Sequence, residues 1–216
     1  MAKNAREWSL ISGVYSKVPL RDKLHVFIRQ KAVPWDILIA ESNWNGSLLD
    51  YGCGHGVLLA IYRQTHPHLK LFGIDHDERK KNVVDRCLPE VKMVEANALT
   101  RQYPDFFDYA VICDMLYCNR PLQREKIISD IWKSLKPGGK LIIKETVSTP
   151  RVKYYLLLLH ELIVMRILKL TKGEGLEVPS PDYYSGLLAR QGFKVTVSKP
   201  VHKGFLHPHH LFACVK

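Results

Sequence analysis

The sequence lacks the features that mark secreted, disulfide-rich or repeat proteins. Its first ten residues, MAKNAREWSL, contain no long apolar run of the kind found in secretory signals. Its five cysteines are an odd number without a CxxC pair, which argues against a disulfide framework. The 216 residues show no internal repeat or low-complexity tract. We therefore expect a single domain with its own core in a reducing cytoplasm.

Acidic residues are scarce in the second half of the chain. Residues 109–216 contain 17 Lys and Arg against 8 Asp and Glu, a net charge of +9, whereas residues 1–108 contain 15 against 13. Such a field attracts nucleic acid, anionic membranes or acidic small molecules, and composition does not choose among them. An ordinary basic surface is an equally good interpretation.

What the sequence does contain is a glycine-rich loop, LLDYGCGHG, at residues 48–56. An apolar strand ends at Asp50, and Gly52, Gly54 and Gly56 then alternate with other residues. Glycine adopts positive φ and has no side chain, so the backbone of this loop can approach a bound ligand closely. A following helix would point free N–H groups at the same ligand. The third glycine comes one position too early for the dinucleotide fingerprint G-x-G-x-x-G.

This loop resembles motif I, D-x-G-x-G-x-G, of the class I S-adenosylmethionine (SAM)-dependent methyltransferases of the small-molecule type. Four later segments follow in the order of that family. They are KLFGID, VKMVEANAL, FDYAVICDMLYC and LKPGGKLIIKE, which resemble its second to fifth strands and the turns beside them. The resemblance covers residues 45–146 well and the rest loosely.

The resemblance implies a SAM site beyond the carboxyl ends of the strands. Asp75 would accept both ribose hydroxyls, and Asp50 would reach the methionine amino group. Asn97 stands where the family usually has an acid that accepts a hydrogen bond from adenine, and the Asn carbonyl oxygen can also accept one. The expected cofactor-binding residues are Asp50, Gly52, Gly54, Gly56, Asp75, His76, Asn97, Ala98, Asp114 and Met115.

The resemblance also implies an α/β fold with a doubly wound, mostly parallel seven-stranded sheet, helices on both faces and an antiparallel last strand. Residues 22–30 and 34–41 read as helices, the second with Pro at its start. Residues 181–200 read as a helix closed by Gly192 and then a strand. The single expected domain, 1–216, divides into an N-terminal helical cap (1–45), a SAM-binding core (46–146), an apolar lid or insertion (149–176) and a C-terminal helix and strand pair (177–216).

The segment from Thr149 to Gly173 is far more apolar than a surface helix needs. His160, Glu161 and Arg166 interrupt it, and each central charge costs roughly 2.5–3.5 kcal/mol on insertion scales, so we expect no transmembrane span. Three interpretations stay open. The segment packs in the core or at a dimer seam, it walls a pocket for a hydrophobic acceptor, or its basic residues meet an anionic membrane at the inner face.

Methyl transfer requires mainly that acceptor, methyl carbon and sulfur be aligned, because the sulfonium of SAM is already activated. A general base helps when the acceptor must lose a proton. The candidate catalytic residues are Tyr117, His160 and His207, with Glu145 as a further candidate base. The candidate acceptor-binding residues are Tyr15, Tyr117, Leu158 and His160. The C-terminal HPHH matches no common zinc spacing, so we expect no metal site.

The chain lacks NPPY or DPPY after the fourth strand and an aromatic-interleaved basic segment, which argues against nucleic-acid acceptors. We therefore predict a SAM-dependent methyltransferase, releasing S-adenosylhomocysteine, for a small apolar or aromatic acceptor, either lipid-linked or polyketide-like. We expect a monomer or a homodimer. The alternatives are an RNA or protein methyltransferase that uses the basic C-terminal half, and a SAM-binding partner protein without catalysis.

Overall fold

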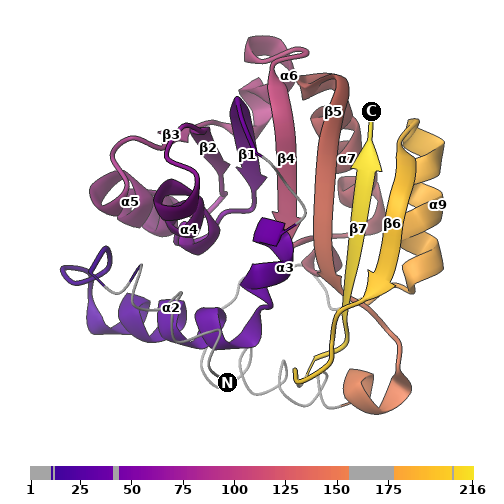
Figure 1. The fold of residues 1–216 in the computed structure, drawn as a ribbon, viewed down its shortest axis with the longest axis horizontal. Coiled ribbons are helices and arrows are strands. Elements are labelled where there is room, and N and C mark those ends of the chain that lie inside the picture. The colour runs from indigo at the N-terminus through magenta and orange to yellow at the C-terminus, as the bar shows by residue number, and fades with distance from the viewer. Residues whose placement is uncertain (1–10, 12, 41–43, 156–177, 206) are drawn as a thin grey trace.

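The computed structural model describes residues 11, 13–40, 44–155, 178–205 and 207–216, and in them a seven-stranded sheet (Figure 1). The strand order is β3-β2-β1-β4-β5-β7-β6, and β7 alone runs antiparallel to its neighbours. This arrangement confirms the predicted fold class. The strands are β1 (Ser47–Tyr51), β2 (Lys70–Ile74), β3 (Lys92–Met93), β4 (Phe107–Cys113), β5 (Leu135–Thr146), β6 (Lys194–Pro200) and β7 (His209–Val215).

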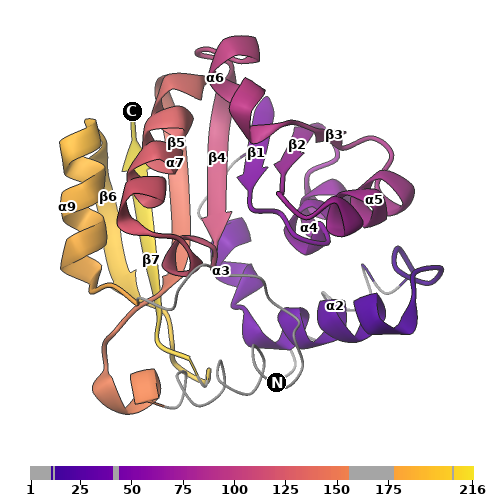
Figure 2. The same ribbon diagram turned by 180° about the vertical axis from the view of Figure 1, so that it is seen from behind.

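Helices cover both faces of the sheet (Figures 1 and 2). The helices are α2 (Leu20–Ala32), α3 (Trp35–Ala40), α4 (Val57–Thr65), α5 (Glu78–Cys87), α6 (Leu99–Gln102), α7 (Pro121–Ser134) and α9 (Pro181–Gln191), with 3-10 turns η1 (Ala96–Ala98) and η2 (Leu116–Cys118). The predicted helices near residues 22–30, 34–41 and 181–191 are all present. Gly192 ends α9 with a φ of 101°, as expected for a left-handed helix cap.

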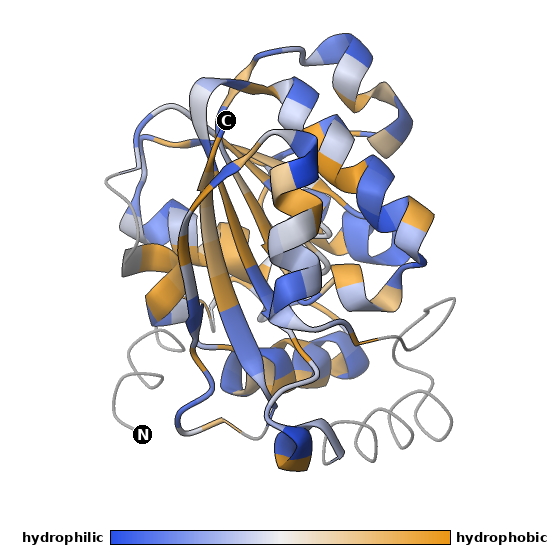
Figure 3. Ribbon diagram, turned by 90° about the vertical axis from the view of Figure 1, so that its right-hand side faces the viewer, coloured by the Kyte–Doolittle hydropathy of each residue, from blue (hydrophilic) through white to orange (hydrophobic). Residues whose placement is uncertain are grey.

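The core consists of two layers separated by the sheet. Leu48 and Ile142 point to a cluster that includes α3, α4 and α5, whereas Leu49 and Ile143 point to a cluster with α6, α7 and α9. Successive strand residues face opposite sides of a sheet, so the apolar runs of β1 and β5 supply both layers. Figure 3 shows the hydrophobic colouring concentrated on the central strands.

The N-terminal helix α2 crosses beneath the carboxyl ends of the strands, away from the two packed layers (Figures 1 and 2). The parallel strands of the sheet all end toward this side, and the loops that follow β1 and β4 contact α2. The position of α2 therefore places a helix opposite the edge where ligands bind in open α/β sheets.

Most of the expected apolar lid, residues 149–176, lies outside the described residues. Residues 151–155 begin a helix, and nothing further along that segment is described before residue 178. In the parts of the chain that the structure describes, no helix has the length and apolar character needed to cross a bilayer.

We expect the Ile131→Ala variant to lose about 2–5 kcal/mol of its free energy of unfolding, because Ile131 is fully buried between α7 and the sheet. Urea denaturation measures this loss. Leu122→Ala is the matched control on the same helix, since Leu122 is 80% exposed, and it should change stability by less than about 0.5 kcal/mol. Equal losses in the two variants would contradict this account of the core.

Candidate functional site

The glycine loop between β1 and α4 is held against two neighbouring strand ends. The N–H groups of Gly52 and Cys53 donate to the Ile74 carbonyl oxygen at 2.8 and 2.9 Å. A Cβ atom on Gly52 would lie 2.6 Å from the Met115 Cγ, so this position requires glycine. A Cβ on Gly54 would meet no described heavy atom within 4 Å. The loop therefore packs tightly at Gly52 and leaves open space at Gly54.

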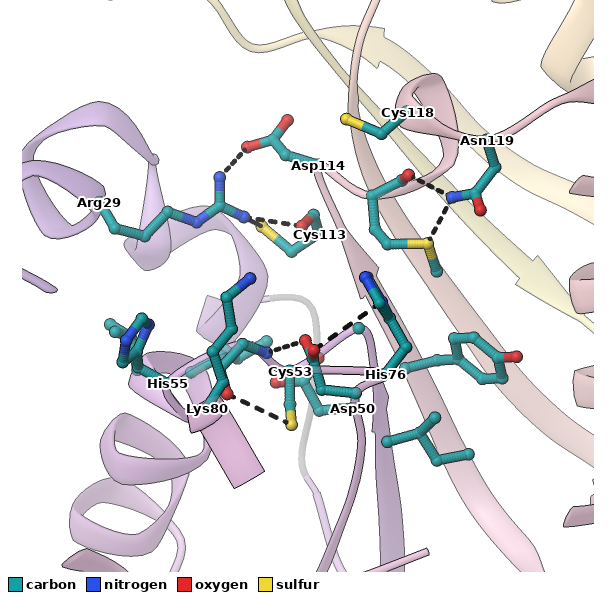
Figure 4. Close-up of a pocket in the computed structure, with 18 of the residues that line it drawn as sticks. Arg29, Asp50, Cys53, His55, His76, Lys80, Cys113, Asp114, Cys118 and Asn119 are labelled. Carbon is teal, nitrogen blue, oxygen red and sulfur yellow. Dashed lines mark hydrogen bonds and ion pairs between the residues drawn. The ribbon is translucent and has the colours of Figure 1, made fainter. Parts of the chain in front are cut away.

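A cavity of about 840 Å³ opens beside this loop, between α2 and the carboxyl ends of β1, β2 and β4 (Figure 4). Its volume lies in the upper part of the roughly 300–1,000 Å³ range of small-molecule sites. The structure brings most of the predicted site residues together here. Those that line the cavity are Asp50, Gly52, Gly54, Asp75, His76, Asp114, Met115 and Tyr117.

Other predicted residues lie elsewhere. Asn97 is exposed and neither it nor Ala98 lines the cavity, where the adjacent Ala96 does. Gly56 sits at the end of the loop, where a Cβ would meet Leu88 at 3.0 Å.

The remaining candidates also lie outside the lining or outside the described residues. Tyr15 is buried, and its hydroxyl donates to the His55 carbonyl oxygen at 2.8 Å. The ring of His207 lies 5.9 Å from that of His209, outside the lining. Leu158 and His160 belong to the segment that the structure does not describe.

Asp75 connects the end of β2 to the glycine loop. Its Oδ2 accepts the Gly54 N–H at 2.8 Å, and its Oδ1 accepts the Asp77 N–H at 2.9 Å. His76 follows with a side chain that is 77% exposed. Each carboxylate oxygen keeps a lone pair beyond these bonds, so Asp75 can still accept hydrogen bonds from a ligand in the cavity.

Asp50 is a buried carboxylate that faces the cavity. Its residue is 2% exposed, and no described residue donates a hydrogen bond to it. Burial raises the pKa of Asp50 to about 7. A buried acid without a donor is unfavourable in the free protein. A cationic group in the cavity would supply the missing partner.

Asp114, at the end of β4, is the centre of a buried charge cluster. Arg29 donates from Nη1 to its Oδ2 at 3.1 Å and from Nη2 to the Cys113 carbonyl oxygen at 2.7 Å (Figure 4). Lys144 also pairs with Asp114, and Thr146 donates to it at 3.1 Å. Burial by itself would raise the pKa of Asp114, but Lys144 and Arg29 outweigh it and hold that pKa well below its usual range.

Glu145 sets the direction of the chain after Asp114. Its Oε1 accepts the N–H groups of Met115 and Leu116 at 2.8 and 2.7 Å. Asp114 itself has a φ of 51°, a left-handed conformation uncommon for a residue with a side chain. Asn119 donates to the Met115 carbonyl oxygen at 2.8 Å and so fixes the same turn (Figure 4). Glu145 does not line the cavity, so its carboxylate holds the loop in place.

Two histidines join α2 to the glycine loop. His55 Nε2 lies 3.1 Å from Asp22 Oδ1, and its ring centroid lies 4.7 Å from that of His25. Burial lowers the pKa of His55, and burial together with the neighbouring His55 lowers the pKa of His25 to about 3. Both imidazoles are therefore neutral near pH 7.

The contributions of Arg29 and His25 to the cavity were missed by sequence reasoning. Arg29 precedes Asp114 by 85 residues and belongs to no motif that would indicate its role. The helical pattern of residues 22–30 was the available signal, because His25 and Arg29 lie one turn apart on it.

Residues 27–198 match a family model described as a methyltransferase domain, well over half of the 216-residue chain. The chain belongs to this methyltransferase family. The methyltransferase uses SAM as its cofactor, and two of its structural relatives were solved with S-adenosylhomocysteine.

Three similar proteins show the range of relatives. The ubiquinone/menaquinone biosynthesis C-methyltransferase of Geobacter sulfurreducens is 28% identical over 175 residues, 71% of this methyltransferase and 67% of that protein. The ribosomal RNA large subunit methyltransferase G of Vibrio campbellii is 27% identical over 112 residues, 44% of this chain but 28% of that protein. The geranyl diphosphate C-methyltransferase of Streptomyces coelicolor superposes with a TM-score of 0.66 at 13% identity, covering 87% and 76% of the two chains, which shows the shared fold.

The raised pKa values of Asp50 and Glu145 predict a stability that depends on pH. Burial, together with the neighbouring Asp114, raises the pKa of Glu145 to about 7, so both acids hold protons in the folded chain that they release when it unfolds. From about pH 4.5 to 7 these two groups therefore lower the free energy of unfolding as pH rises. His25 and His209 shift in the opposite sense, with pKa values lowered to about 3.

The measurement is the difference in unfolding free energy between the parent and an Asp50→Asn, Glu145→Gln double variant at each pH. The parent should lose stability relative to the variant as the pH rises through this window, because the variant cannot ionise at these positions. Asp85→Asn, an exposed acid on α5, is the control and should show a flat difference. A flat difference for the double variant would contradict the raised pKa values.

Proposed function

We propose that the methyltransferase binds SAM across the cavity, with the methionyl part at the glycine loop and the ribose at Asp75. The carboxylate of Asp50, to which no described residue donates, supports this placement, because it would accept a hydrogen bond from the amino group of the ligand inside the buried cavity. The open space at Gly54 would admit the ligand against the backbone. Asp75 keeps acceptor capacity for the two ribose hydroxyls.

On this proposal, the residues after β2, β3 and β4 flank the adenosine. His76, Ala96 and Met115 line that part of the cavity. Asn97 and Ala98 stay predictions as cofactor contacts, since they adjoin Ala96 but do not line the cavity.

The acceptor is proposed to be a small apolar or aromatic molecule, either lipid-linked or polyketide-like. The observation that carries this proposal is the lining of the cavity beyond the cofactor residues, where Trp35, Tyr117 and Ile127 supply apolar and aromatic surface. Apolar walls with few polar groups are typical of sites for such ligands. Two relatives are named for ubiquinone/menaquinone biosynthesis and for geranyl diphosphate, and these names agree with an apolar acceptor here.

Methyl transfer requires this chain mainly to align the acceptor with the methyl group of SAM and to exclude water from the site. SAM supplies an activated methyl group on its sulfonium. The Met115–Leu116 turn, held by Glu145, would fix the wall against which the acceptor lies. Tyr117 is the candidate general base that lines the cavity, because Asp114 is paired with Arg29 and Lys144 and Glu145 is occupied by backbone N–H groups.

RNA is the second candidate acceptor. The partial similarity to a ribosomal RNA methyltransferase and the net charge of +9 in residues 109–216 favour it over other macromolecules. The cavity argues for the small molecule, because Trp35, Tyr117 and Ile127 give part of its lining apolar and aromatic surface. A protein acceptor and a chain that binds SAM without transferring methyl stay as alternatives to be separated by experiment.

We expect Asp75→Ala to weaken SAM binding by about 30-fold or more, since it removes both ribose acceptors and the anchor of Gly54. Isothermal titration calorimetry measures the dissociation constant. Asp85→Ala is the matched control, an exposed acid on the adjoining helix α5 that should bind SAM like the parent. Unchanged affinity in Asp75→Ala would show that the cofactor placement is wrong.

Transfer of a radiolabelled methyl group from SAM into a cell extract tests the acceptor. We expect the label in the organic-soluble fraction, and about 10- to 100-fold less of it with Tyr117→Phe if the acceptor must lose a proton. Label in RNA would favour the second candidate, and label in protein would favour a protein acceptor. Intact SAM binding with no label in any fraction would support a binder without catalysis.

A further inference from the structure

Helix α2 carries its large apolar side chains on the outside of the molecule. Leu20 is 81% exposed, Leu24 is 55% exposed, and Phe27 and Ile28 are each 43% exposed. Their spacing of four, three and one residues places them along one side of a helix. We call these four residues the outer stripe. A helix on the surface of a globular protein normally has the reverse arrangement, with polar residues facing water.

The inner side of α2 holds the polar residues. Asp22 and Gln30 are buried, Asp22 contacts His55 of the glycine loop, and Arg29 pairs with Asp114. Val26 is the one fully buried apolar residue among them on this helix. Helix α2 therefore differs from an ordinary amphipathic helix, because most of its polar contacts face the protein and its large apolar side chains face outward.

The surface around the stripe is basic. Lys17, Arg21 and Lys31 are exposed, and Lys23 is half-buried. The single acid among residues 13–33 is Asp22, which is buried against the glycine loop. An apolar stripe bordered by Lys and Arg is the pattern of helices that lie in the interface of an anionic bilayer.

The charges disfavour pairing of the stripe with a second copy. An antiparallel pair of α2 helices would place the Lys17 end of one copy against the Lys31 end of the other, and a parallel pair would place like ends together. Neither arrangement would bring an exposed acid of residues 13–33 against these lysines, so like charges would meet. An anionic lipid surface satisfies both the apolar stripe and its basic border.

We propose that the outer stripe of α2 docks the methyltransferase on an anionic membrane surface. The stripe would enter the headgroup region, and the basic border would contact lipid phosphates. His25 and Arg29 of the same helix line the cavity, so docking would hold the site near the bilayer. The helical segment of residues 151–155, which contains the exposed Val152 and Tyr155, lies at the same lower edge of the molecule as α2 in Figures 1 and 2. Delivery of an acceptor from the lipid rests on the proposed function, whereas docking does not.

Sedimentation with vesicles tests the docking directly and needs no acceptor. The full chain is mixed with vesicles of phosphatidylcholine alone or with 30% phosphatidylglycerol, which carries a phosphate charge. We expect binding to the anionic vesicles that is about tenfold weaker on the neutral ones and weakens at high salt. A Leu20→Asn, Leu24→Asn variant should lose about tenfold or more of this binding.

Two further variants make the test specific. Lys17→Glu with Lys31→Glu should lose binding to anionic vesicles, because it reverses the basic border. Leu122→Asn changes an equally exposed leucine on α7 and should bind like the parent. SAM titration of each variant checks that it is folded.

The outcomes distinguish a membrane surface from a second copy of the chain as the partner of the outer stripe. Vesicle binding that is lost in both α2 variants and kept in Leu122→Asn supports the proposal. Binding unaffected by the α2 variants overturns it, as does the absence of binding by the parent. A dimer in analytical ultracentrifugation that Leu20→Asn, Leu24→Asn dissociates, without vesicle binding, would assign the stripe to a second copy. Vesicle binding without radiolabel in the organic-soluble fraction would contradict only the proposed acceptor. Radiolabel in that fraction without vesicle binding would contradict only the docking inference.

Discussion

The buried carboxylate of Asp114 is the interaction on which the arrangement of the site depends. It lies at the end of β4 and joins Arg29 of α2 to Lys144 and Thr146 of β5, so it connects three elements of the fold. Two cations near one buried anion are stable only while all of them are present, because removing one partner leaves an uncompensated buried charge. Asp114 thus ties α2 over the cavity to the end of β4, and Glu145 holds the turn that follows it.

The two acids that end β1 and β4 behave differently because their surroundings differ. Asp114 is surrounded by donors of this chain and stays ionised without a ligand. Asp50 has no such donor, and its pKa rises to about 7. Asp114 therefore has a structural role, whereas the carboxyl group of Asp50 can pair with a ligand in the cavity. This division follows from hydrogen bonding and burial, since both residues are aspartates at strand ends.

The sequence allowed prediction of those parts of the site that depend on local geometry. The glycine spacing after Asp50 and the strand-end Asp75 come together because parallel strands end at one edge. Arg29 and the anchoring role of Glu145 could not be predicted, because each depends on contacts between elements that no motif connects. The segment after the third strand was predicted only in part. Its paired part is two residues long, Ala96 lines the cavity, and the predicted Asn97 is exposed.

The antiparallel strand β7 also contacts the helix that caps the site. His209 Nε2 donates to the Ala32 carbonyl oxygen at 3.0 Å across 177 residues of sequence. A contact of such long range costs more loop-closure entropy than a local contact does. The packing of α2 near the N-terminus therefore depends on a contact from β7 near the C-terminus. During synthesis, α2 acquires its complete set of contacts only after β7 has left the ribosome.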